Sequence, residues 1–134
     1  MMLFDASSIV NLVKRGVVKP LAGNATLDLA VYEAFNAVWK EHAVLGRIDG
    51  ETAGRLARIL AGVFELMDLL SAAGSAEAIL GLAVDTGLTF YDAAYLYKAG
   101  ERGYTLVTDD KRLLREAAGR VEALSTAQLL GENM

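Results

Sequence analysis

Short apolar runs alternate with longer amphipathic segments along the whole chain. Residues 1–4 (MMLF) are uniformly apolar, and residues 104–108 (YTLVT) alternate and are rich in β-branched side chains. Both runs predict buried strands. Residues 25–31 (ATLDLAV) and 120–125 (RVEALS) predict two weaker strands.

The segments between and after these strands show the spacing of apolar residues that helices have. Glycine closes several of them, including Gly16, Gly87 and Gly103, as it often does at the carboxyl end of a helix. The predicted helices cover residues 7–16, 31–46, 49–67, 75–87, 89–103, 111–119 and 126–133.

Strands that alternate with helices are typical of βαβ units, in which helices cover both faces of a parallel sheet. The sequence therefore predicts an α/β fold, a three-layer α/β/α sandwich with a central parallel sheet. Because no linker or internal repeat is evident, residues 1–134 are predicted to form a single domain. In such sheets, ligands bind beyond the carboxyl ends of the strands.

Composition narrows the classes of function. The chain has no cysteine, which excludes thiolate chemistry. It has one histidine, His42, which argues against a metal site built from histidines. The net charge of −4 argues against a protein that coats nucleic acid, but it is compatible with an enzyme that holds nucleic acid through cations. With no membrane-length apolar run and no signal peptide, a cytoplasmic protein without membrane contact is expected.

Four acidic residues need an explanation. Asp5 and Asp110 follow the two clearest strands, whereas Glu33 and Asp92 lie within otherwise apolar helical segments. Each acid has an ordinary structural interpretation, as a helix N-cap, as an ion-pair partner of Lys40 or as half of a capping box. One shared site is the simpler explanation for all four.

A shared site for these carboxylates would need a cation, because like charges in one place repel one another. Oxygen ligands without nitrogen or sulfur suit hard ions such as Mg²⁺ or Mn²⁺. Such ions in carboxylate clusters typically serve phosphate chemistry. The residues alone therefore indicate an enzyme that acts on phosphate esters.

Four segments in this order, LFDASSIV, YEAFNAVW, TFYDAAYLYKAGERG and TLVTDDKRL, resemble the PIN domain, and specifically the VapC-type toxins of bacteria and archaea. The resemblance runs over nearly the whole chain. It implies a Mg²⁺- or Mn²⁺-dependent endoribonuclease that cleaves single-stranded RNA, the toxin component of a toxin–antitoxin pair. It also implies a cognate antitoxin and a homodimer.

The same resemblance assigns roles to particular residues. The catalytic and metal-binding set that it implies is Asp5, Glu33, Asp92 and Asp110, with Ser7 and Thr108 in support. The T-x-D spacing selects Asp110 over Asp109, although both positions hold aspartate. Asn11, one helical turn after Ser7, is a further candidate to face the site.

Several other features have two interpretations. Basic residues are candidates for contacts with RNA phosphates or are simply solvated: Lys14, Arg15, Lys19, Lys111, Arg112 and Arg115. Tyr91, Tyr95 and Tyr97 are candidates for base stacking or for packing, and Trp39 for the core or a partner surface. The alternative for the whole protein is a non-catalytic PIN-like module that binds RNA or protein.

Overall fold

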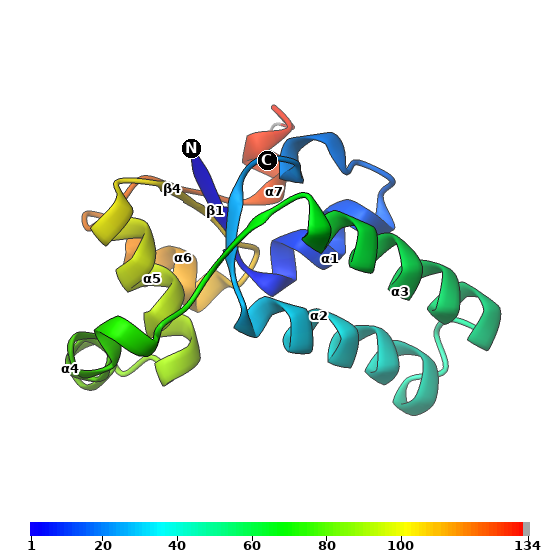
Figure 1. The fold of residues 1–134 in the computed structure, drawn as a ribbon, viewed down its shortest axis with the longest axis horizontal. Helices are drawn as coiled ribbons and strands as arrows, with labels where there is room; N and C mark the ends of the chain where they lie inside the picture. Colours follow the sequence, from blue (N-terminus) through cyan, green and yellow to red (C-terminus); the bar gives the residue numbers. More distant parts are fainter. Residues whose placement is uncertain (133–134) are drawn as a thin grey trace.

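A five-stranded parallel sheet lies at the centre of the computed structural model, which describes residues 1–132 of the chain (Figure 1). The strands are β1 (Met2–Phe4), β2 (Ala25–Leu27), β3 (Asp68–Leu70), β4 (Thr105–Val107) and β5 (Ala123–Leu124). Their order is β3-β2-β1-β4-β5, so the two strands that are clearest in the sequence pair at the middle. Leu3 of β1 aligns with Ala25 of β2 on one side and with Leu106 of β4 on the other.

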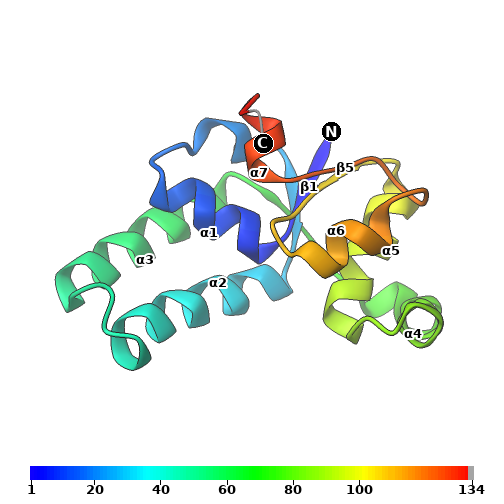
Figure 2. The same ribbon diagram turned by 180° about the vertical axis from the view of Figure 1, so that it is seen from behind.

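Helices cover both faces of this sheet, which confirms the predicted three-layer α/β/α sandwich (Figure 1 and Figure 2). One layer contains α1 (Ala6–Lys14), α2 (Leu29–Trp39) and α3 (Gly50–Glu65). The other contains α4 (Ala76–Thr86), α5 (Phe90–Arg102) and α6 (Lys111–Ala117), and the short α7 (Thr126–Leu129) packs beside α1. Short 3₁₀ turns occur at Lys19–Leu21 and Ala73–Ser75. Within the described chain, no helix combines the length and hydrophobicity needed to cross a bilayer.

The strands differ from the sequence prediction in two places. The predicted strand over residues 25–31 ends at Leu27, because the Asp28 carboxylate caps the next helix by accepting a hydrogen bond from Leu29 N–H at 2.8 Å. A π-helical turn at Lys40–Val44 then extends α2. The strand β3 was not predicted, because it is short, follows the predicted helix over residues 49–67 directly and has two exposed residues among its three.

The core is centred on the two middle strands. Four residues of these strands are fully buried, because helices cover both faces of the sheet: Leu3, Phe4, Leu106 and Val107. Strands buried on both faces have near-continuous apolar sequences, which explains why these two were visible in the sequence.

The path of the chain reverses direction at β1. Helix α1 leads from β1 to β2 on one face, whereas α4 and α5 lead from β3 back to β4 on the opposite face. In parallel α/β sheets this reversal creates a crevice at the carboxyl ends of the strands, where ligands bind. The fold therefore places the residues that follow β1 and β4 at this crevice.

Candidate active site

Asp5 follows β1 directly and begins α1. Its Oδ1 accepts a hydrogen bond from the backbone N–H of Ser8 at 2.9 Å, so the carboxylate is the N-cap of α1. Asp5 is 5% exposed. Burial raises the pKa of its carboxyl, and hydrogen bonds from Thr108, Ser8 and Ser7 act in the opposite direction. Capping and a role in a shared site are compatible, because each carboxylate oxygen can accept more than one partner.

Two hydroxyl groups hold the Asp5 carboxylate. Ser7 Oγ donates to Oδ1 at 2.7 Å, and Thr108 Oγ1 donates to Oδ2. Each hydroxyl also accepts a backbone N–H from the loop after β4, Ser7 from Asp109 at 3.1 Å and Thr108 from Asp110 at 3.0 Å. A hydroxyl that accepts an N–H keeps its single hydrogen for donation. The loop after β4 thereby fixes the orientation of a carboxylate at the end of β1.

Glu33 projects from α2 toward α5. The Tyr95 hydroxyl donates to Glu33 Oε1 at 2.7 Å, so Glu33 does not depend on Lys40 for a partner. Burial raises the pKa of Glu33, the hydrogen bond from Tyr95 lowers it and the charge of Asp5 raises it. Burial and the Glu33 carboxylate raise the pKa of Tyr95 in turn, so its hydroxyl stays protonated and remains a donor.

Asp92 lies in the first turn of α5 and is half-buried. The Thr89 hydroxyl accepts the Asp92 N–H at 3.1 Å, so Thr89 caps this helix. The Asp92 carboxyl has a pKa raised from 3.8 to about 6 by burial and by the charges of the other three acids, whereas Arg112 acts in the opposite direction. Asp92 therefore lies within electrostatic range of Asp110, Asp5 and Glu33.

Asp110 is the N-cap of α6. Its Oδ1 accepts the backbone N–H of Leu113 at 2.9 Å, and the residue is exposed. As with Asp5, the capping interpretation is correct, and it leaves the second carboxylate oxygen available for another partner.

The neighbouring Asp109 lies outside this group. Its carboxylate accepts hydrogen bonds from Asn11 Nδ2 at 2.7 Å and from Thr126, whereas Asp110 is the aspartate of this loop whose charge raises the pKa of Asp92. This geometry favours Asp110 as the fourth acid, in agreement with the T-x-D spacing. It also gives Asn11, a further candidate to face the site, a partner other than the four acids.

The donor set and the charge suit a hard divalent cation. All four groups are carboxylates, and the raised pKa of Asp92, Glu33 and Asp5 reflects negative charge that is poorly solvated. Within residues 1–132, however, no three acidic or histidine side chains are placed to hold one ion together. Metal binding therefore requires these carboxylates to turn toward the ion, which the partly exposed Asp92 and the exposed Asp110 allow.

The basic candidates have different environments. Lys14 pairs with Glu41 at 2.6 Å, and Arg15 pairs with Glu132. Arg112 Nη2 donates a hydrogen bond to the Gly87 carbonyl at 2.6 Å. This contact holds the positively charged guanidinium of Arg112 near Asp92.

The aromatic candidates separate by burial. Tyr95 is 1% exposed and belongs to the core, whereas Tyr91 is 57% exposed. Trp39 is 56% exposed, so the interpretation as a core residue is wrong. His42 is exposed.

Sequence reasoning missed two features of the site. It left Tyr95 open between base stacking and packing and did not foresee its hydrogen bond to Glu33, although Tyr95 shares a helical face with Asp92. It also gave no role to Asp109 beyond that of a competitor to Asp110, and no local pattern in the sequence reveals the contact with Thr126.

Comparison with known proteins agrees with this architecture. No family model matches the chain. The chain is 43% identical over 99 residues to a protein named exonuclease VapC9 from Pyrobaculum aerophilum, which covers 73% of this chain and 70% of that relative. It is also 38% identical over 88 residues to a protein named ribonuclease VapC3 from the same organism. This match covers 66% of this chain and 66% of that relative.

A solved structure gives the same result for the fold. The crystal structure of PAE2754 from Pyrobaculum aerophilum matches with a TM-score of 0.79 and 38% identity, over 97% of this chain and 93% of that one. The extent of the sequence identity and the shared parallel α/β architecture show that this chain belongs to the VapC family of PIN-domain proteins.

Proposed function

We propose that this protein is a nuclease, and specifically an endoribonuclease that cleaves single-stranded RNA with Mg²⁺ or Mn²⁺ as the toxin of a toxin–antitoxin pair. One observation carries the proposal: at the crevice beside β1 and β4, burial and the charges of Asp110, Asp5 and Glu33 raise the pKa of Asp92 to about 6. The names of two relatives, an exonuclease and a ribonuclease, support nuclease activity.

In this proposal, Asp5 and Asp92 hold the ion, and Glu33 and Asp110 complete the site directly or through water. A divalent cation bound there supplies positive charge next to the phosphate and lowers the pKa of a coordinated water. Asp5 is the anchoring ligand, because its carboxylate is already fixed on both oxygens by hydroxyl donors.

The chain's own residues then orient the reacting groups. Tyr95 occupies Glu33 Oε1, which leaves Oε2 to accept a hydrogen bond from a water aimed at phosphorus. Arg112, anchored on the Gly87 carbonyl, is the cation best placed to contact a substrate phosphate. Lys14 and Arg15 are weaker candidates for that contact, because each already has an acidic partner.

A groove of about 330 Å³ between α1 and α2 opens beside Ser7 and ends at Lys14 and Glu41. Its lining is mostly apolar, with Ala6, Val10 and Ala37 among the residues that form it. A groove of this kind next to Asp5 gives the unpaired bases of a single strand an apolar surface, which base-paired RNA could not use.

One observation favours a second candidate. Since no three acidic side chains within residues 1–132 are placed for one ion, a non-catalytic module that binds RNA or protein through the same crevice fits the metal-free geometry equally well. The two candidates differ in whether RNA is cut.

The test uses purified, antitoxin-free protein and a varied set of single-stranded RNAs. Cleavage is expected with Mg²⁺ or Mn²⁺ and not with EDTA, and Asp92→Asn should lower the rate by about two orders of magnitude or more. The products should carry 5′-phosphate and 3′-hydroxyl ends, because the 2′-hydroxyl is not the nucleophile. A cyclic phosphate would indicate a contaminating metal-independent ribonuclease.

A further inference from the structure

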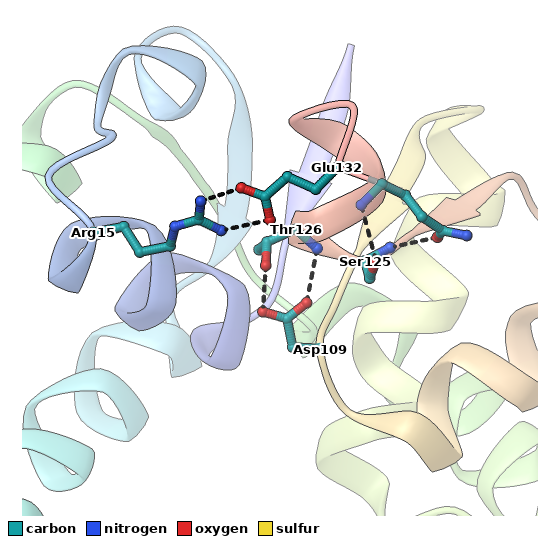
Figure 3. Close-up of polar contacts among 6 residues, drawn as sticks. Arg15, Asp109, Ser125, Thr126 and Glu132 are labelled. Carbon is teal, nitrogen blue, oxygen red and sulfur yellow. Dashed lines mark hydrogen bonds and ion pairs between the residues drawn. The ribbon is translucent and has the colours of Figure 1, made fainter. Parts of the chain in front are cut away.

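Within residues 1–132, the side chain of Asp109 accepts three hydrogen bonds, more than that of any other acid that the proposed chemistry does not use. Its Oδ1 accepts the backbone N–H of Thr126 at 2.7 Å (Figure 3). Its Oδ2 accepts the Thr126 hydroxyl at 2.7 Å and Asn11 Nδ2 at 2.7 Å. One carboxylate therefore joins the loop after β4 to α1 and to the start of α7.

Helix α7 is itself held firmly at this place. Ser125 and Gln128 form a capping box, with Gln128 N–H donating to Ser125 Oγ at 3.1 Å and Ser125 N–H donating to Gln128 Oε1 at 2.9 Å (Figure 3). Beyond the helix, Glu132 pairs with Arg15 at the end of α1. Thr126 thus presents its N–H and its hydroxyl to Asp109 from a fixed position.

The backbone of Asp109 connects this junction to the acidic site. Its N–H donates to Ser7 Oγ at 3.1 Å, and Ser7 Oγ donates to Asp5 Oδ1 at 2.7 Å. The chain of contacts runs from Thr126 through the Asp109 side chain and backbone to Ser7, and from Ser7 to the carboxylate that the proposed function makes the anchoring ligand.

We propose that Asp109 is a positioning residue, which holds the loop after β4 against Ser7 and so fixes the Asp5 carboxylate for the metal ion. This inference rests on the proposed metal-dependent nuclease function. Asp109 does not touch the ion or the RNA in this account. It acts through Ser7, and α7 acts through Asp109.

The principal variant is Asp109→Ala, which removes the three side-chain hydrogen bonds and keeps the backbone N–H. It should weaken Mn²⁺ binding, measured by calorimetry, by roughly tenfold or more and slow RNA cleavage to a similar degree, as is typical when a group that orients a metal ligand is lost. Asp109→Asn should recover part of the loss, because an amide can still pair with Asn11 and Thr126. Thr126→Val, which removes one of the three bonds, should give an intermediate effect if the alanine variant does not fold.

A double-mutant cycle with Ser7→Ala separates positioning from other effects. If Asp109 acts through Ser7, its substitution should have no further effect on Mn²⁺ affinity once Ser7 is alanine. A through-space effect of the lost charge, or general loosening of the fold, would persist in full in that background and would overturn the inference. Unchanged Mn²⁺ affinity in Asp109→Ala would also overturn it.

Asp49→Ala is the matched control, because it also removes an aspartate carboxylate, one that caps α3 by accepting a hydrogen bond from Thr52 N–H at 2.7 Å and lies outside this junction. It should lower the melting temperature without changing Mn²⁺ affinity. Failure of the proposed function gives a different result from failure of the inference. In the first case the wild-type protein binds no Mn²⁺ and cuts no RNA. In the second case the wild-type protein binds Mn²⁺ and cuts RNA, but the effect of Asp109→Ala on Mn²⁺ affinity is the same with and without Ser7→Ala.

Discussion

The surroundings of Asp92 oppose its ionisation. Its pKa is raised from 3.8 to about 6, first by burial and then by Asp110, Asp5 and Glu33. In the unfolded chain this carboxyl ionises near pH 4. Between these two values the folded protein binds more protons than the unfolded chain, so stability decreases as the pH rises from about 4 to above 6.

Asp92→Asn should therefore stabilise the metal-free protein at about pH 7.5 and leave it unchanged at about pH 4, where the native carboxyl is protonated. Mn²⁺ should reverse the order, since ligand binding stabilises the wild type by about 2.7 kcal/mol when the free ion is at about 100 times its Kd. Thermal melts in EDTA and in Mn²⁺ measure both effects, with Asp85→Asn, an exposed aspartate of α4, as the control. Equal melting temperatures of wild type and Asp92→Asn in EDTA at the higher pH would contradict the crowding of these charges.

Tyr95→Phe isolates the hydrogen bond to Glu33. The bond lowers the pKa of Glu33, so its loss should raise that pKa and move the acid limb of the pH–rate profile to higher pH. The free energy of unfolding should fall by about 1 kcal/mol, the usual net value of one hydrogen bond. A slower rate with an unmoved acid limb would mean that Tyr95 serves packing alone.

The sequence indicates the acids of the candidate site but not their contacts. Asp5 and Asp110 stand out in the sequence because they follow apolar strands, and Asp92 because it interrupts an apolar helix face. The contacts of Tyr95 with Glu33 and of Asp109 with Thr126 join residues far apart in the chain. Such pairs depend on how the helices pack, which local patterns do not encode.

At the scale of elements, helix caps and candidate ligands are the same residues. Asp5 begins α1 and Asp110 begins α6, each through a hydrogen bond to a backbone N–H of the first turn. The capping role of these aspartates is compatible with the proposed functional one, and mutagenesis must separate the two.

Asp110→Ser and Asp110→Ala achieve that separation. Serine is as good an N-cap as aspartate, so Asp110→Ser should keep the melting temperature, whereas Asp110→Ala should cost about 1 kcal/mol. Both lack the carboxylate and should lose most RNA cleavage. Full cleavage by Asp110→Ser would remove Asp110 from the proposed site.

The elements were predicted in proportion to their burial. Strands β1 and β4 are buried on both faces and have distinct apolar sequences, and most helices were found within a few residues. Strand β3 was not predicted, because its sequence, DLL, is short and two of its residues are exposed. Its position depends on pairing with β2, in which Asp68 aligns with Ala25.

At the scale of the whole molecule, apolar side chains remain on the surface. Among residues 1–132, several large ones are more than half exposed, including Tyr32, Trp39, Leu80, Val84 and Tyr91. Surface of this kind commonly marks an interface between proteins. We expect a homodimer, because two-fold dimers are the commonest closed assembly. Light scattering at micromolar concentration and ordinary salt checks this, and a monomer mass would refute it.

The central claim is that Asp5, Glu33, Asp92 and Asp110 together bind a divalent cation and cut single-stranded RNA internally. Incubation of metal-loaded protein with circular single-stranded RNAs of varied sequence tests it most directly, because a circle offers no end to an exonuclease. The account predicts that wild-type protein linearises at least one circle in Mn²⁺, and that neither Asp92→Asn in Mn²⁺ nor wild type in EDTA does so. Protein that binds Mn²⁺ and the circles yet leaves every circle intact would contradict it.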